Sequence, residues 1–193
     1  MAGPTNAERG TAARTKLLAA AGELIGEIGW NAVSTRVLAE RADMRPGLVH
    51  YHFESLQALL RQAALEAMEG MLAGTAELLT ATDDPADAVD AMLAELDRYT
   101  GADPASLLFI EAYLAATRDP VLHERMQALV HRFRGGVAAA LARTGHPAPE
   151  AAAVLVMAVF DGFLLHKGLD PALSAASIAP LLRRVTDTPG APA

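Results

Sequence analysis

The stretch from Arg45 to residue 52 carries side chains that could recognise the edges and the backbone of a DNA duplex. Arg45 can pair with a guanine edge or with a phosphate, and Leu48 could touch a thymine methyl group. The His-Tyr-His run at 50–52 offers donors for phosphate oxygens, and Gly47 would let the backbone approach a groove. These residue types indicate contacts to bases and phosphates.

The segments around this stretch predict a helix-turn-helix that would position it. Ser34 can cap a short helix, and residues 43–45 form the turn that follows. Pro46 suits the first position of the next helix, because its missing N–H would be unpaired there anyway. Val49 and Phe53 lie four residues apart and predict the buried face of that helix. Such a layout can press a short polar helix into a major groove.

Two longer helices flank this motif. The earlier helix ends at Gly29 and starts either at Thr5, which forms a capping box with Glu8, or at Thr11. The later helix opens at Glu54-Ser55 and runs to about residue 80. The earlier helix has one predicted buried stripe: Leu17, Ala21, Leu24 and Ile28.

Composition and charge divide the 193-residue chain into two parts. Residues 1–62 hold 7 basic and 6 acidic residues, whereas residues 63–193 hold 9 and 17. A near-neutral first part can still bind phosphates beside an acidic second part, because salt limits the reach of a charge to ~8 Å. The charge split supports two parts but does not identify DNA. The absence of cysteine excludes disulfides, thiolate metal sites and cysteine nucleophiles.

The second part predicts only helices, which makes the chain all-α with about nine helices. Prolines that follow Asp, or that close the run 146–149, recur at intervals of helical length and can start helices. The apolar run 151–160 is shorter than the ~18 residues that a spanning helix needs, and the N-terminus has no signal-peptide core. We therefore expect a cytoplasmic protein with no membrane partner. The Asp-Pro pairs begin at Asp84, Asp103, Asp119 and Asp170.

Residues 14–60 resemble the N-terminal domain of TetR-type (tetracycline-repressor-like) bacterial transcriptional regulators. A weaker similarity to the penultimate helix of that family covers 161–171. The resemblance implies a DNA-binding domain at 10–54, a ligand-binding and dimerisation domain at 55–187, and flexible tails at 1–9 and 188–193. The matching residues are Ala20-Ala21, Gly29, Ser34-Thr35, Leu38-Ala39, Ala42, Gly47, His52-Phe53, Ser55 and Leu59-Leu60.

Four positions depart from the family pattern. Asp43 replaces the turn glycine, and Asp tolerates the left-handed conformation less comfortably. Arg45 replaces a serine cap and adds a positive charge, and His50 replaces a frequent tyrosine. Leu56 replaces a lysine that would contact phosphate, so operator affinity or sequence preference is expected to differ from the family average.

By this resemblance we expect a homodimeric repressor that is released from a near-palindromic operator by a small apolar or amphipathic molecule. The residues themselves show no catalytic set and no metal-ligand spacing, so no catalytic residue, cofactor or metal is expected. The predicted DNA contacts are Thr15, Ser34, Thr35, Arg36, Arg45, Pro46, Gly47, Leu48, His50, Tyr51, His52 and Ser55. The predicted ligand pocket comprises Met68, Met71, Leu72, Tyr99, Phe109, Glu111, Tyr113, Phe133, Met157 and Phe160. The predicted dimer interface comprises Val154, Met157, Asp161, Leu165 and Leu181.

Several alternatives remain open from the residues alone. Glu111, the only charged residue of its helix, could line a pocket, pair with Arg132 or Arg134, or face solvent. Arg41 and Arg61 are expected at the solvated surface. The motif could also serve an activator or a constitutive DNA binder. It could instead be purely structural in a helical small-molecule-binding protein.

Overall fold

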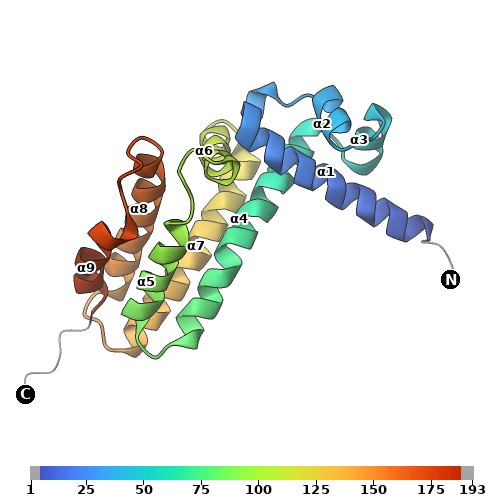
Figure 1. The fold of residues 1–193 in the computed structure, drawn as a ribbon. Helices are drawn as coiled ribbons and strands as arrows, with labels where there is room; N and C mark the ends of the chain where they lie inside the picture. The colour runs from blue at the N-terminus through green and yellow to red at the C-terminus, as the bar shows by residue number, and fades with distance from the viewer. Residues whose placement is uncertain (1–4, 188–193) are drawn as a thin grey trace, which may run out of the picture. The chain divides into compact units, whose positions relative to one another are not determined.

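The structure, a computed structural model, describes residues 5–187, and within them it contains nine α-helices, one 3-10 helix and no strand (Figure 1). The predicted all-α fold is confirmed. The helices are α1 (Asn6–Ile28), η1 (Trp30–Ala32), α2 (Thr35–Arg41), α3 (Pro46–His52), α4 (Leu56–Ala81), α5 (Pro85–Leu96), α6 (Pro104–Ala116), α7 (Pro120–Arg143), α8 (Pro149–Lys167) and α9 (Ala175–Thr186).

The helices form two compact units. The first unit extends to Met68 and also includes Pro104–Leu122, and the second unit contains Glu69–Asp103 and the described residues from His123 onward. The boundary between the units therefore falls inside the continuous helix α4 and not at 54/55, where the sequence suggested a division. Helix α6, expected in the second domain, packs within the first unit.

Helix α6 packs closely against α1 in the first unit because α1 has a glycine, Gly26, at the point of contact. A Cβ atom added at Gly26 would lie 2.0 Å from the carbonyl oxygen of Pro104, at the start of α6. Only a residue without a side chain allows the two backbones to come so close. Gly22, one turn earlier on α1, faces the side chain of Leu108 at an ordinary 3.5 Å. The α1–α6 contact thus depends on one particular glycine.

Helix α1 begins at the earlier of its two candidate caps. The Thr5 hydroxyl accepts a hydrogen bond from the Glu8 N–H at 3.3 Å, and the Glu8 carboxylate accepts one from the Thr5 N–H at 2.6 Å. The helix therefore starts inside the segment expected to be a flexible tail. It ends at Gly29, which has a φ of 84°. The predicted buried stripe is wrong at Ile28, which is 44% exposed, whereas Ile25 is fully buried.

The second unit has its own core, drawn from the second half of α4 and from α5, α7, α8 and α9. Asp84 caps α5 as predicted, because its carboxylate accepts the Ala86 N–H at 2.9 Å. The Asp170-Pro171 pair starts no helix, since α9 begins only at Ala175. The most deeply buried core residues are Val89, Leu93, Val137, Leu141 and Val156.

Among the described residues, α8 is the one helix whose length and composition would suffice to cross a membrane. It is 19 residues long, which is longer than the apolar run 151–160 that the sequence suggested. A core helix of a soluble protein passes the same test, so this property is weak evidence for a membrane span.

Candidate nucleic-acid interface and body cavity

The turn between α2 and α3 has the geometry that the sequence predicted. The Ser34 hydroxyl caps α2 by accepting the Val37 N–H at 3.3 Å, and Leu38 is fully buried. Asp43 has a φ of 51°, in the left-handed region that the family's glycine would occupy more easily. The Met44 N–H then donates to the Ala39 carbonyl at 2.9 Å, which closes the turn.

Helix α3 is anchored through one face and presents the other. Val49 is fully buried and Phe53 nearly so, as their spacing predicted. Arg45 occupies the cap position without a side-chain hydrogen bond to the helix, and Pro46 follows as its first residue. The Arg45 side chain is exposed and makes no ion pair within residues 5–187. Its charge is therefore available to a DNA phosphate or a guanine.

The outward face of α3 is open to a large partner. Tyr51 is 81% exposed, His50 and Leu48 are exposed, and nothing lies within 4 Å of a Cβ atom built on Gly47. His52 is half-buried, and its ring meets that of Tyr51 edge to face, with centroids 5.0 Å apart. A surface without obstruction around a short helix suits insertion into a groove.

The remaining residues predicted to contact DNA differ in their exposure. Thr15 and Arg36 are exposed, whereas Thr35 is half-buried. The Ser55 hydroxyl accepts the Ala58 N–H at 3.1 Å, so it caps α4 in addition to any contact with DNA. Leu56, where the family has lysine, is half-buried at the start of α4.

Two arginines of the first unit make ion pairs. Arg41 forms ion pairs with Glu23 at 3.3 Å and, at shorter range, with Glu27. Arg41 is exposed, so these ion pairs lie at the surface. Arg61 is half-buried, and its guanidinium lies 2.9 Å from the Asp119 carboxylate, which also caps α7. The expectation that Arg61 is a solvated side chain was therefore wrong. Local sequence patterns could not predict this pair, since its members are 58 positions apart.

Glu111 has a partner that none of the alternatives included. Its carboxylate accepts the Trp30 N–H at 2.8 Å, at the start of the 3-10 helix η1. A Cβ atom on Gly29 would meet the same carboxylate at 3.5 Å. A carboxylate that accepts a backbone N–H satisfies both groups. Glu111 therefore joins α6 to the end of α1 within the first unit.

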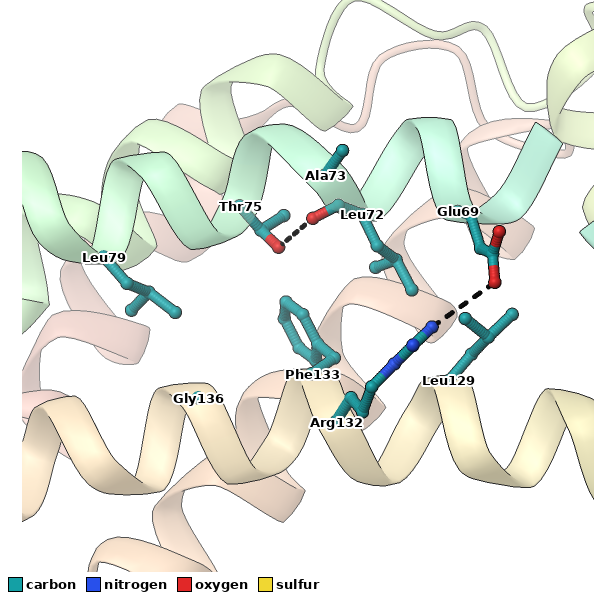
Figure 2. Close-up of a pocket in the computed structure, with 9 residues that line it drawn as sticks. All are labelled: Glu69, Leu72, Ala73, Thr75, Leu79, Leu129, Arg132, Phe133 and Gly136. Atoms are coloured by element: carbon teal, nitrogen blue, oxygen red, sulfur yellow. Dashed lines mark hydrogen bonds and ion pairs between the residues drawn. The ribbon is translucent and has the colours of Figure 1, made fainter. Parts of the chain in front are cut away.

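A cavity of about 370 Å³ lies between α4 and α7 in the second unit (Figure 2). Its apolar lining includes Leu72 and Phe133, both predicted for the pocket, and Leu129. Polar groups lie along the same gap: Arg132 approaches Glu69 at 3.4 Å, and Thr75 donates to a backbone carbonyl. The full lining is Glu69, Leu72, Ala73, Thr75, Leu79, Leu129, Arg132, Phe133 and Gly136.

The other residues predicted for the pocket lie elsewhere. Phe160 is buried in the core of the second unit, with its ring centroid 6.2 Å from that of Phe133. Tyr113 is 62% exposed. The first unit contains four of the predicted residues, because α6 and the first half of α4 belong to it: Met68, Phe109, Glu111 and Tyr113. Outside the cavity lining, Met71, Tyr99 and Met157 are half-buried.

Helices α8 and α9 expose apolar side chains that a monomer leaves uncovered. Val154 and Leu165 are each 49% exposed, and Leu181 is 62% exposed. The single chain therefore leaves part of the apolar surface of α8 uncovered. Asp161 lies half-buried on the same helix. Burial raises the pKa of its carboxyl to about 6, and no ion pair within the described residues offsets that cost.

Two family profiles match the chain. The profile described as "Bacterial regulatory proteins, tetR family" matches residues 17–63. The profile described as "Tetracyclin repressor-like, C-terminal domain" matches residues 83–188, which is more than half of the chain. No curated protein matches the chain.

Solved structures resemble the chain over nearly its whole length. A proposed transcriptional regulator from Streptomyces coelicolor A3(2) is 28% identical, with a TM-score of 0.73 and coverage of 91% of this chain and 99% of that chain. A transcriptional regulator from Rhodococcus sp. Rha1 is 26% identical, with a TM-score of 0.78 and coverage of 90% and 93%. The multidrug binding protein EbrR, complexed with imidazole, is 29% identical, with a TM-score of 0.68 and coverage of 92% of each chain.

The resemblance seen in the sequence and these matches agree on one family. Its members are DNA-binding regulators and not enzymes, which fits a helix-turn-helix whose recognition face is open. The chain belongs to the tetR family of bacterial regulatory proteins and is a DNA-binding transcriptional regulator.

Proposed function

We propose that this regulator is a homodimeric repressor that reads a near-palindromic operator through α3 and leaves it when a small molecule enters the second unit. The observation that carries this proposal is the outward face of α3. Arg45 and Tyr51 are free to contact DNA, while Val49 anchors the helix. An Arg fork recognises guanine bidentately, and tyrosine can donate to a phosphate oxygen.

Dimerisation is supported by the exposed apolar side chains of α8 and α9. Full burial of one such residue, Leu181 for example, is worth roughly 1.5–3 kcal/mol. A second copy of the chain offers the same surface, and a two-fold axis lets it cover both. Two copies of α3 would then read half-sites one or more DNA turns apart, roughly 34–36 Å per turn.

The effector is proposed to be a small apolar or amphipathic molecule. The cavity of about 370 Å³ is near the lower end of the size range for ligand pockets. Leu72, Leu129 and Phe133 would contact an apolar body, and the Arg132–Glu69 pair would meet a polar group. The relative EbrR is described as a multidrug binding protein, which is consistent with an adaptable apolar site.

The proposed response passes through α4. This helix is continuous from Leu56 to Ala81, so its first half belongs to the unit that holds α3 and its second half lines the cavity. A ligand can shift the regulator away from DNA only if it binds the DNA-incompetent conformation more tightly. The proposal therefore requires unequal ligand affinity in the two states.

DNA footprinting on the region upstream of the protein's own coding sequence tests repression there. We expect a protected near-palindrome, with affinity that falls steeply as salt is raised. Candidate apolar ligands should then release the protein. Absence of salt-sensitive protection would exclude repression at that region. Protection that every ligand leaves unchanged would favour a constitutive binder. Increased transcription from the protected region, measured separately, would identify an activator.

A further inference from the structure

We propose that Arg14, on α1, is a positioning residue that holds the C-terminal end of the recognition helix α3. This inference rests on the proposed reading of DNA by α3. It concerns the orientation of that helix and not a further contact with DNA. The partners of Arg14 are remote in the chain, so the local sequence pattern gives no sign of this role.

One guanidinium connects three elements of the first unit. Arg14 Nη1 donates to the carbonyl of His52, the last residue of α3, at 2.9 Å. Its carbon atom lies 4.2 Å from the centroid of the Phe53 ring. Arg14 Nη2 donates to the Gln62 side-chain oxygen on α4. The end of α3 is thereby held from α1 and α4 together.

Each of these contacts is favourable for a guanidinium group. The last carbonyls of a helix have no partner within the helix, and a cation at this end is favoured by the helix dipole. The face of an aromatic ring attracts a guanidinium. Gln62 is oriented in turn, because its amide nitrogen donates to the Glu66 carboxylate at 2.8 Å and leaves its oxygen toward Arg14.

The Arg14 side chain forms hydrogen bonds within the protein, whereas the Arg45 side chain is exposed and makes no ion pair within the described residues. The Arg14 side chain is half-buried, and both terminal nitrogens donate within the first unit. Lysine could not replace it, because a single ammonium lacks the planar fork that bonds His52 and Gln62 while lying over Phe53. The substitution Arg14→Lys therefore removes the geometry and keeps the charge.

The test compares Arg14→Lys with the matched control Arg118→Lys in the full-length chain. Arg118 is exposed in the turn after α6, and no hydrogen bond or ion pair is found for its side chain in residues 5–187. We expect Arg14→Lys to weaken operator binding about tenfold and to leave affinity for an unrelated duplex within about twofold, because non-specific binding follows charge. Arg118→Lys should change neither affinity.

Amide hydrogen exchange at residues 50–53 provides a readout that does not depend on DNA. The Phe53 N–H donates to Val49 at the end of α3, so release of this end should speed its exchange in Arg14→Lys while α1 stays protected. Unchanged exchange together with unchanged operator affinity would overturn the inference, and so would a parallel fall of operator and non-specific affinity. Faster exchange in a protein with no operator preference would reject the proposed function and keep the positioning contact.

Discussion

The two units of this protein differ in which of their charged side chains are paired: Arg45 contrasts with Arg183, and Glu111 contrasts with Asp161. In the first unit Arg45 is exposed and unpaired within the described residues, while the Glu111 carboxylate is satisfied by the Trp30 N–H. In the second unit Arg183 lies among carboxylates, including Asp90 at 2.6 Å, while the carboxylate of Asp161 has no such partner. Residue type alone therefore does not locate function.

The net charge of the chain does not by itself show where an anion can bind. The chain carries a net charge of −7, which is unfavourable for binding to the DNA polyanion. In the second unit Arg183 pairs with Asp84, Asp87 and Asp90, so the charge of this arginine is not available to an anion. The first unit keeps Arg45 available. Local availability of a cation, more than the total, decides where phosphate can bind.

The largest expected effect comes from breaking the first unit at Gly26. Gly26→Ala places a methyl group 2.0 Å from the Pro104 carbonyl oxygen, so α1 and α6 must separate. We expect a loss of about 3 kcal/mol or more in the free energy of unfolding, measured by urea denaturation. Gly22→Ala is the control on the same helix and should stabilise by roughly 0.5–1 kcal/mol. Equal effects of the two substitutions would contradict the close approach of α1 and α6.

The second prediction removes Arg45, an exposed cation of the first unit that makes no ion pair within the described residues. Arg45→Ala should weaken operator binding by about 1–3 kcal/mol, because it deletes a base or phosphate contact. The unfolding free energy should change little, since Arg45 is exposed and makes no ion pair within the described residues. Fluorescence anisotropy with operator DNA measures the affinity. An intact variant that binds as tightly as the parent would remove Arg45 from the interface.

The third prediction concerns Asp161, a half-buried carboxylate of the second unit that makes no ion pair within the described residues. The folded-state pKa of Asp161 is raised to about 6 from 3.8, so the folded state binds the proton more tightly. The free energy of unfolding contributed by this group therefore falls as pH rises from about 4 to about 6, and it stays low above that range. Asp161→Asn should be more stable than the parent at neutral pH by about 1–3 kcal/mol.

Thermal unfolding of the parent and Asp161→Asn across this pH range checks the sign. The difference between the two proteins should shrink as pH falls toward 4, because the parent's carboxyl becomes neutral. A difference that does not vary with pH would show that the substitution acts through packing and not through ionisation.

The smallest expected effect comes from the paired cation of the second unit. Arg183→Gln should lower Tm modestly, because it removes the ion pairs between α9 and the start of α5 at a partly exposed site. It should leave the salt dependence of DNA binding unchanged, in contrast to Arg45→Ala. A reduced salt dependence in Arg183→Gln would make this arginine a phosphate contact and would erase the distinction between the two units.

Local features of the fold were predictable because their causes lie within a few residues. Ser34 caps a helix through an N–H three positions away, and Asp84 does so through one two positions away. The left-handed conformation at Asp43 follows from its place in the turn. The buried Val49 and exposed Tyr51 follow from helical spacing. These contacts close over short stretches of chain, so the residue pattern records them directly.

The sequence by itself therefore determined the all-α fold, most helix boundaries and which face of α3 is exposed. Only the tertiary structure decided that Glu111 binds Trp30, that Arg14 holds the end of α3 and that α6 belongs to the first unit. It also decided which residues line the cavity. Each of these contacts joins segments that are remote in the chain, and helical periodicity specifies which face is buried without specifying what covers it.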